Sequence, residues 1–282
     1  MNNQVIGVIG SGTMGNGIAH VSALSGYQVF LVDINKELLE KAVNAISSNL
    51  DKQISKGVIS ADNKLDVLEN ITATTNMSDV YDSDLIIEAV PEDKNIKNKI
   101  FSDLDSICKS ETILASNTSS ISIAEIGRKT NRPDKIIGMH FMNPVPIMKL
   151  VEVVITSDTS DHTRKIIIEI AKNMGKFPVE CNDYPGFVSN RILMPMINEA
   201  IFCLEQGVAT KNAIDDIMTL GMAHPMGPLK LADLIGLDVC LSIMEVLFDG
   251  FKDEKYKPCN LLKEMVENGN LGRKTGLGFY KY

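Results

Sequence analysis

Short apolar segments alternate with longer segments of helical periodicity over the first two thirds of the chain. The apolar runs are typical of strands buried on both faces of a sheet, and the amphipathic segments are typical of helices that cover it. Strands are predicted at residues 5–9, 28–32, 71–74, 84–89, 112–116, 136–141, 150–156 and 177–181. Helices are predicted at residues 14–25, 36–56, 61–69, 94–108, 122–127 and 163–174. This alternation indicates an α/β fold with a mainly parallel sheet.

The pattern changes after Pro185, where helical periodicity continues without a convincing strand. Helices are predicted at residues 189–206, 211–221, 228–248 and 259–267. We therefore place a domain boundary at Asp183, with an α/β domain over residues 1–183 and an all-α domain over residues 184–282.

A glycine-rich turn lies between the first predicted strand and the first predicted helix. The segment GSGTMG fits the dinucleotide-binding pattern G-x-G-x-x-G, with Gly10, Gly12 and Gly15 at the glycine positions. The first glycine permits the tight turn, the second lets the backbone approach a pyrophosphate, and the third lets helix and strand pack closely. The helix that begins at Met14, directly after Thr13, then directs free N–H groups at the phosphates.

Asp33 ends the second predicted strand, 18 positions after Gly15. A carboxylate there accepts hydrogen bonds from a ribose 2′-OH and repels a 2′-phosphate, which favours NAD over NADP. The alternative is a glycine-rich turn without a ligand and an Asp33 that is merely solvated. The strand before the turn, the glycine spacing, the helix after it and the acid Asp33 together favour a Rossmann-type domain that binds NAD.

Composition narrows the class of protein further. The chain has 282 residues, 44% of them hydrophobic, and a formal net charge of −8, which argues against nucleic acid as a partner. No segment has the roughly 18 uncharged apolar residues of a membrane span, and the start of the chain has no basic leader. We therefore expect a cytoplasmic protein. Free thiols and no metal site are expected, because no C-x-x-C pair occurs among Cys108, Cys181, Cys203, Cys240 and Cys259.

Several longer motifs occur in order along the chain: EAVPED, ASNTSS, GMHFMNPVPIMKLVEV, DYPGFVSNR, HPMGPLKLADLIGLD and GRKTGLGFYKY. With GSGTMGNGIAH at the start, they resemble the L-3-hydroxyacyl-CoA dehydrogenase family, and within it the short bacterial 3-hydroxybutyryl-CoA dehydrogenases. The blocks HFMNPVPIMKLVEV and PGFVSNR are far more specific than the glycine motif. The resemblance extends over essentially the whole chain.

Two titratable residues lie on adjacent predicted strands. His140 ends one strand, and Glu152 lies on the next, 12 positions further on. A carboxylate that contacts one ring nitrogen fixes the tautomer of a histidine and stabilises its imidazolium form. The resemblance implies that His140 is the general base of alcohol oxidation and that Glu152 orients it. From the pattern alone, a structural histidine is the more common outcome.

The resemblance also implies that Ser119 and Asn190 hold the substrate oxygen. Ser119 follows a strand at the carboxyl edge of the sheet, where such folds bind ligands. The alternatives are a turn and N-cap before the helix at residues 122–127, and for Asn190 a helix-start hydrogen bond.

Further ligand contacts come from the resemblance alone. It implies cofactor contacts at Glu92, Lys97, Asn117, Ser119, Asn143 and Lys274, and contacts with CoA at Lys56 and Lys97. Lys56 could equally be a solvated helix end, and Asn49 replaces a serine that contacts CoA in some relatives. The tail that carries Lys274 is expected to fold back toward the active site, the alternative being a frayed terminus.

The resemblance implies an NAD-dependent enzyme that interconverts (S)-3-hydroxyacyl-CoA and 3-oxoacyl-CoA. It also implies that the C-terminal domain contributes to substrate binding and forms a homodimer. Two alternatives stay open at this point: a dehydrogenase of a non-CoA hydroxy acid or sugar acid, and a non-catalytic NAD-binding protein. The presence of His140, Glu152 and Asn190 argues against the second.

Overall fold

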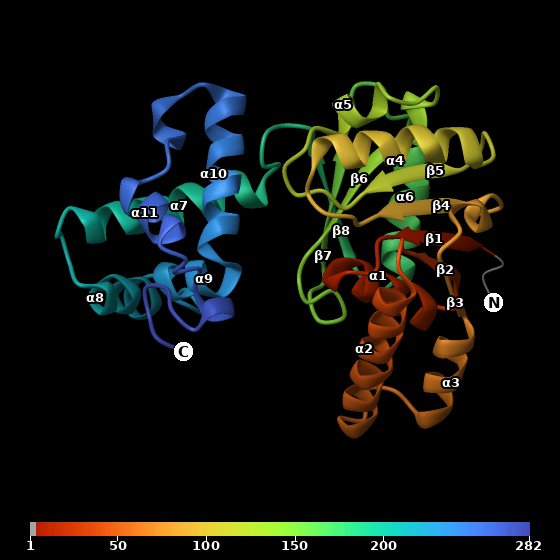
Figure 1. Cartoon of the computed structure of the whole chain (residues 1–282), viewed down its shortest axis with the longest axis horizontal. Helices are drawn as coiled ribbons and strands as arrows, with labels where there is room; N and C mark the ends of the chain where they lie inside the picture. The colour runs from red at the N-terminus through yellow and green to blue at the C-terminus, as the bar shows by residue number, and fades with distance from the viewer. Residues whose placement is uncertain (1–3) are drawn as a thin grey trace. The chain divides into compact units, whose positions relative to one another are not determined.

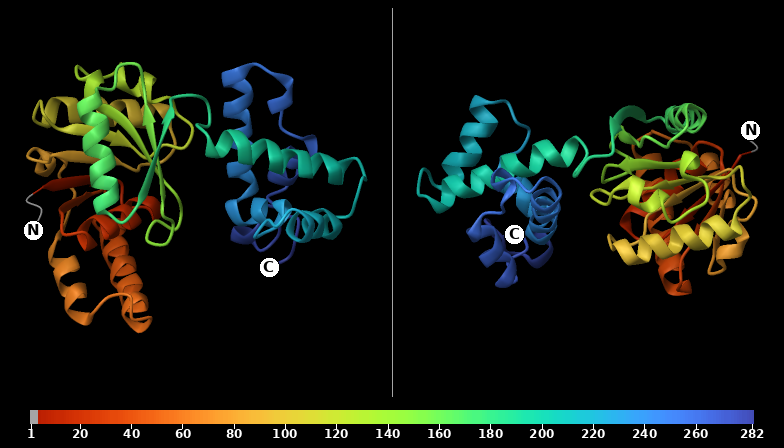
Figure 2. Two further views of the ribbon diagram at one scale, coloured as in Figure 1. Left: turned by 180° about the vertical axis from the view of Figure 1, so that it is seen from behind. Right: turned by 90° about the horizontal axis from the view of Figure 1, so that it is seen from above.

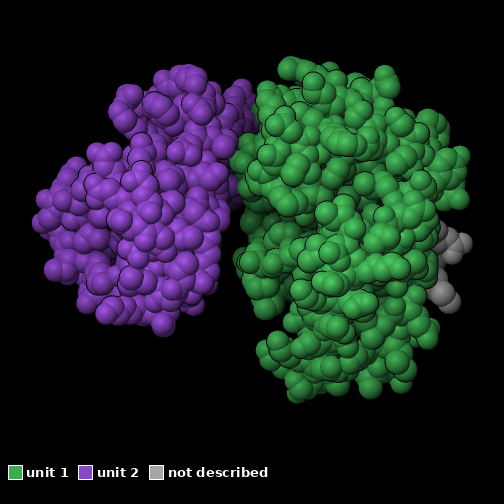
Figure 3. All heavy atoms as spheres, viewed as in Figure 1, with its two compact units in different colours: residues 1–183 green, residues 184–282 purple. Residues whose placement is uncertain are grey.

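The computed structural model describes residues 4–282; the first three residues, at the predicted start of the fold, lie outside the described part. The chain divides into two compact units, Met1–Asp183 and Tyr184–Tyr282, which Figure 3 distinguishes by colour. Each unit has its own hydrophobic core. The two units are described separately below.

The first unit contains one sheet with the strand order β3-β2-β1-β4-β5-β6-β7-β8. Neighbouring strands are parallel except β6 and β7, so β7 and β8 run against the other strands. The strands are β1 (Val5–Ile9), β2 (Gln28–Val32), β3 (Ile71–Thr74), β4 (Leu85–Glu88), β5 (Ile113–Ser116), β6 (Ile136–Phe141), β7 (Leu150–Ile155) and β8 (Phe177–Asn182). The prediction of an α/β fold with a mainly parallel sheet is confirmed.

Helices cover both faces of this sheet (Figures 1 and 2). One face packs against α1 and α6, and the other is covered by α4 and α5. The helices of this unit are α1 (Thr13–Leu24), α2 (Lys36–Ser55), α3 (Ala61–Glu69), α4 (Lys94–Ile107), α5 (Ile123–Gly127) and α6 (Asp161–Asn173), with 3₁₀ turns η1 (Met77–Val80) and η2 (Pro133–Lys135). Because both faces are covered, every residue of β4, β5 and β6 is buried, as their apolar sequences require.

The strand register brings the candidate site residues to one edge of the sheet. Ile9 of β1, Glu88 of β4, Ser116 of β5 and Gly138 of β6 are successive register partners. All four strands are parallel, so the residues that follow this row lie at the common carboxyl edge. The glycine turn, the segments after β4 and β5, and His140 therefore share that edge.

The second unit is helical. Its elements are α7 (Ser189–Glu205), α8 (Lys211–Asp216), the π turn η3 (Ile217–Gly221), α9 (Pro228–Ile235), α10 (Leu237–Phe251), η4 (Glu254–Tyr256), α11 (Asn260–Glu267) and η5 (Arg273–Thr275). The prediction of one helix over residues 228–248 is wrong. Gly236 adopts φ 106°, a conformation that ends α9 before α10 begins.

The C-terminal tail docks on α9. Asp233 is buried, and its carboxylate accepts hydrogen bonds from the backbone N–H groups of Phe279 and Tyr280, both at 2.9 Å. The Tyr280 hydroxyl donates to Asp215 at 2.9 Å. The tail is therefore an ordered part of the helical unit. Within residues 4–282, no helix combines the length and the apolar character needed to cross a membrane.

Candidate active site

The glycine turn after β1 has the geometry of a dinucleotide-binding loop. Gly10 adopts φ 96°, and a Cβ there would lie 2.7 Å from the carbonyl oxygen of Ala89. A Cβ at Gly15 would lie 1.8 Å from the carbonyl oxygen of Gly10, so only glycine allows α1 to pack this closely on the turn. By contrast, a Cβ at Gly12 would have no atom within 4 Å, which leaves the backbone open to a ligand.

A cavity of about 830 Å³ adjoins this turn. Its lining includes Gly10, Gly12, Thr13, Met14 and Asp33. One Asp33 oxygen accepts hydrogen bonds from the backbone N–H and the hydroxyl of Ser11, both at 2.7 Å. An open glycine turn, a helix N-terminus and a carboxylate at the end of β2 fit the pyrophosphate and ribose of NAD.

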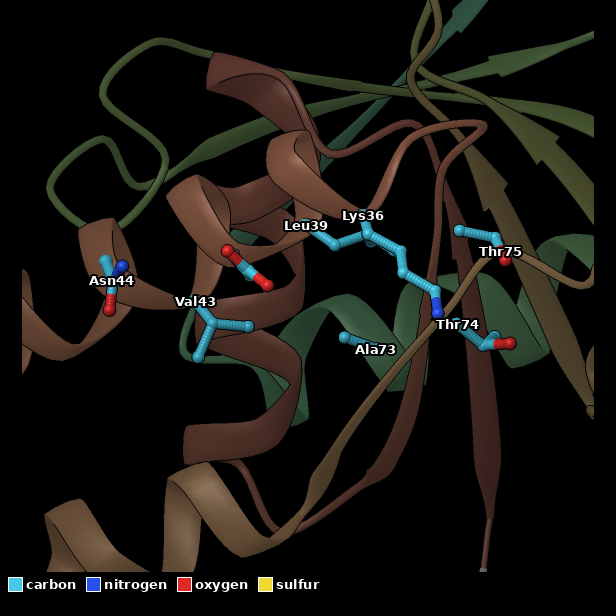
Figure 4. A pocket seen from close by; sticks show the side chains of 8 residues that line it. Lys36, Leu39, Val43, Asn44, Ala73, Thr74 and Thr75 are labelled. Atoms are coloured by element: carbon cyan, nitrogen blue, oxygen red, sulfur yellow. The ribbon is translucent and has the colours of Figure 1, made fainter.

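A second hollow of about 560 Å³ lies between α2 and the end of β3. Figure 4 shows its side chains, with Lys36 extending toward Thr74. Thr75 lines both hollows, but none of the predicted site residues lines this second one.

His140 and Glu152 form a direct pair. They lie opposite each other in the antiparallel register of β6 and β7, which places both side chains on one face of the sheet. Nδ1 of His140 lies 2.7 Å from Oε2 of Glu152, and both side chains are buried. A buried carboxylate at this distance fixes the ring orientation and stabilises the imidazolium form.

The turn after β5 is held by Glu92. Oε1 of Glu92 accepts hydrogen bonds from the Ser119 N–H at 2.9 Å, the Ser120 N–H at 3.0 Å and the Thr118 hydroxyl at 2.5 Å. The amide oxygen of Asn117 accepts from the Phe141 N–H at 2.9 Å, which joins the exits of β5 and β6. The turn that carries Ser119 is therefore fixed beside the strand that carries His140.

Lys97 has a different environment from the one that the resemblance implies. Its side chain is 1% exposed, and its ammonium forms ion pairs with Glu88 at 2.6 Å and Glu92 at 3.3 Å. This enclosed position does not support a contact with the CoA phosphates, and the contacts of Lys97 with CoA and with the cofactor stay predictions.

Sequence reasoning missed two anchoring carboxylates, Glu88 and Asp183. Glu88 is fully buried and accepts a hydrogen bond from the Ser116 hydroxyl at 2.7 Å. Asp183 accepts from the Ser122 hydroxyl at 2.7 Å and the Ala124 N–H at 2.9 Å, at the start of α5. An acid that directly continues the apolar run at residues 85–87, inside a strand predicted to be buried, is the signal that could have identified Glu88.

The remaining predicted residues lie outside this cluster or in the second unit. Asn143 is exposed in the loop after β6, and Lys56 is exposed at the end of α2. Asn190 is buried in the first turn of α7. Lys274, in η5, forms an ion pair with Asp238 at 2.6 Å.

A Rossmann sheet with an open glycine turn, and a histidine–carboxylate pair at the same edge, define the class of protein: NAD-dependent dehydrogenases. Comparison with known proteins makes this more specific. Residues 5–184 match the model of the 3-hydroxyacyl-CoA dehydrogenase NAD binding domain, and residues 186–282 match the model of the C-terminal domain of the same family. The chain belongs to the 3-hydroxyacyl-CoA dehydrogenase family.

Individual relatives are similar over their full length. A Deinococcus radiodurans protein named probable 3-hydroxybutyryl-CoA dehydrogenase is 55% identical over 98% of this chain and 99% of the relative. The 3-hydroxybutyryl-CoA dehydrogenase of Clostridioides difficile is 51% identical over 98% of this chain and 99% of its own. The crystal structure of (S)-3-hydroxybutyryl-CoA dehydrogenase from Ralstonia eutropha superposes with a TM-score of 0.97 at 46% identity, covering 100% of this chain and 99% of that one.

Proposed function

We propose that this protein catalyses the NAD-dependent, reversible oxidation of (S)-3-hydroxyacyl-CoA to 3-oxoacyl-CoA, with 3-hydroxybutyryl-CoA and acetoacetyl-CoA as its substrate pair. The observation that carries the proposal is the His140–Glu152 pair, at 2.7 Å, on the sheet edge that also bears the glycine turn. The names of the full-length relatives support the four-carbon CoA thioester.

In this mechanism His140 is the general acid and base. With Nδ1 held by Glu152, Nε2 removes the proton of the substrate hydroxyl during oxidation and returns it during reduction. Glu152 stabilises the imidazolium that forms. When NAD is bound at the glycine turn, it supplies the acceptor or donor of the hydride.

Ser119 and Asn190 are proposed to hold the substrate oxygen. A hydroxyl and an amide are suitable donors for an oxygen that gains negative charge in the transition state. For the cofactor we propose contacts at Glu92, Asn117, Ser119, Asn143 and Lys274, in addition to the glycine turn and Asp33. Lys56 is exposed and cationic, so it remains our candidate for a contact with the CoA phosphates.

A comparison of substrates tests the proposed function. Purified protein is given NADH with acetoacetyl-CoA, free acetoacetate or a keto sugar acid, and the loss of NADH is followed. Turnover of the thioester at a far higher kcat/KM than the free acids is expected. Preference for a free acid would favour a different dehydrogenase on this scaffold, and the absence of turnover with all of them would contradict catalysis.

We also propose a homodimer formed through the C-terminal helical unit. Large apolar side chains are exposed around its π turn, with Leu220 86% exposed and Ile217 and Met222 also exposed. Exposed apolar clusters are typical of interfaces. Leu220→Glu is expected to shift the mass measured by light scattering from dimer to monomer, whereas Leu65→Glu, at an exposed leucine of α3, is not. A wild-type monomer, or an unchanged Leu220 variant, would contradict this interface.

A cytoplasmic location is proposed as well. The five cysteines of the chain are unpaired, which is typical of proteins kept in a reducing compartment.

A further inference from the structure

The ammonium group of Lys97 lies between two carboxylates that have different surroundings. It contacts Oε1 of Glu88 at 2.6 Å and Oε2 of Glu92 at 3.3 Å. Lys97 and Glu88 are almost completely buried, whereas the side chain of Glu92 is 36% exposed. One cation therefore joins a carboxylate of the sheet interior to a carboxylate at the candidate site.

The interior end of this arrangement is rigid. Glu88 ends β4, and its Oε1 also accepts from the Val90 N–H at 2.7 Å, while Oε2 accepts from the Ser116 hydroxyl at 2.7 Å. The Val90 carbonyl oxygen accepts from the Lys97 ammonium at 3.2 Å. The buried Glu88 carboxylate thus has three defined partners, the Lys97 ammonium, the Val90 N–H and the Ser116 hydroxyl, and has little freedom to move.

At the candidate site, the two carboxylate oxygens of Glu92 contact different partners. Oε2 faces Lys97, whereas Oε1 accepts hydrogen bonds from Thr118, Ser119 and Ser120 in the turn. Burial raises the pKa of the Glu92 carboxyl, but the Lys97 charge and these hydrogen bonds lower it by more, so the net pKa lies below its usual range. The carboxylate therefore stays ionised and keeps its acceptor capacity.

We infer that Lys97 is a positioning residue: anchored by Glu88, it fixes the ionised Glu92 so that Glu92 holds the turn that carries Ser119. Lys97 then acts on catalysis without contacting the substrate. The inference rests on the proposed function, in which Ser119 holds the substrate oxygen.

A purely structural role makes a different prediction. If Lys97 only neutralised Glu88, removing both charges together would leave a satisfied interior, because buried ion pairs can often be replaced by neutral groups without loss of stability. If Lys97 also serves Glu92, the double replacement restores the interior but leaves Glu92 without its cation.

The experiment compares Lys97→Met, the double variant Glu88→Gln with Lys97→Met, and Lys99→Met as a matched control. Lys99 lies on the same helix, is exposed, and pairs only with the exposed Asp103 in the described chain. Tm and the pH dependence of kcat are measured with acetoacetyl-CoA and NADH, and the pKa of Glu92 is measured by NMR of carboxyl-labelled protein, with Glu92→Gln for assignment.

Lys97→Met is expected to lower Tm, because it leaves two buried or partly buried carboxylates without a cation. The double variant is expected to regain most of the lost Tm while its kcat stays about 10- to 100-fold below wild type. On acidification, the double variant is expected to lose activity at a higher pH than the wild type does, because the pKa of Glu92 rises when Lys97 is absent. Lys99→Met is expected to match the wild type in every measurement.

Recovery of both Tm and the pH profile in the double variant would overturn the inference, as would an unchanged pKa of Glu92. The NMR titration needs no turnover, so it tests Lys97 even if the wild-type protein does not reduce acetoacetyl-CoA. That last result would count against the proposed function alone.

Discussion

At the scale of single residues, the proposed chemistry depends on the ring of His140. His140→Gln keeps a polar side chain of similar size but cannot take up a proton, so Glu152 would have no imidazolium to stabilise during the reaction. We expect kcat to fall about 10²- to 10⁴-fold, the usual contribution of a general acid–base group. NADH affinity, measured by fluorescence titration, is expected to stay nearly unchanged, because the glycine turn is untouched. Turnover near the wild-type rate would refute the assignment of the base.

Cofactor choice is a second residue-scale property, and Asp33 is its proposed determinant. The carboxylate lines the cavity beside the glycine turn, where it would repel a 2′-phosphate. Asp33→Ala is expected to raise the ratio of kcat/KM for NADPH to that for NADH by about an order of magnitude or more. Glu37→Ala removes an exposed acid from α2 that does not line the cavity, and it is expected to leave this ratio unchanged. Equal ratios in both variants would exclude Asp33 as the determinant.

At the scale of elements, the glycine turn allows ligand binding and folding to be separated. An added methyl at Gly12 meets no atom within 4 Å, whereas one at Gly15 would lie 1.8 Å from a backbone oxygen. Gly12→Ala is expected to keep the wild-type Tm and to weaken NADH binding, since the methyl occupies the approach of the pyrophosphate. Gly15→Ala is expected to lower Tm by forcing α1 away from β1. Thermal denaturation and NADH titration check both, and equal effects of the two variants would contradict this division.

The elements themselves were largely predictable from the sequence. The bounds of β1, β2, β3 and β6 agree with the predicted ranges. For β1 and β6 the reason is burial, because a strand buried on both faces has little choice of residue. The break at Gly236 was missed because a glycine inside a helical pattern costs only about 1 kcal/mol and does not by itself end a helix. Tertiary contacts decide the break: the Leu237 N–H donates to the carbonyl of Leu271, in the docked tail, and a Cβ at Gly236 would lie 3.1 Å from Nζ of Lys274.

The site was predictable only where its residues are joined by a short connection. His140 and Glu152 lie on strands joined by one loop, so the order of the strands allowed their side chains to meet. Their roles as base and orienting acid came from the family resemblance. The contact of Glu92 with the Ser119 turn joins segments that only the sheet brings together. Lys97 lies only nine positions after Glu88, but their contact depends on which face of α4 carries the lysine. A pattern along the chain cannot show whether a lysine on an amphipathic helix faces solvent or a buried acid.

At the scale of the whole molecule, acid stability depends on groups buried in the core. His20 lies on α1 and is fully buried. Burial lowers the pKa of His20 to about 4, against a smaller opposing effect of Gln53, and the Lys176 charge lowers it further. In the unfolded chain the same ring has a pKa of about 6.5. As the pH falls from about 6.5 to about 4, the unfolded state therefore takes up a proton that the folded state does not.

Stability consequently decreases on acidification through this window, and the contribution of His20 levels off below it. This difference between the pKa of His20 in the unfolded and folded states lowers the free energy of unfolding by about 3 kcal/mol between neutral pH and pH 4. The pKa of Glu92 is lowered in the folded state, so its contribution to stability also decreases as the pH falls. This contribution is the same in all the variants compared. His20→Gln is expected to flatten the slope of unfolding free energy against pH, measured by urea denaturation between about pH 4 and 7. His162→Gln, at an exposed position on α6, is expected to keep the wild-type slope. A wild-type slope in the His20 variant would mean that other groups account for the acid sensitivity of the fold.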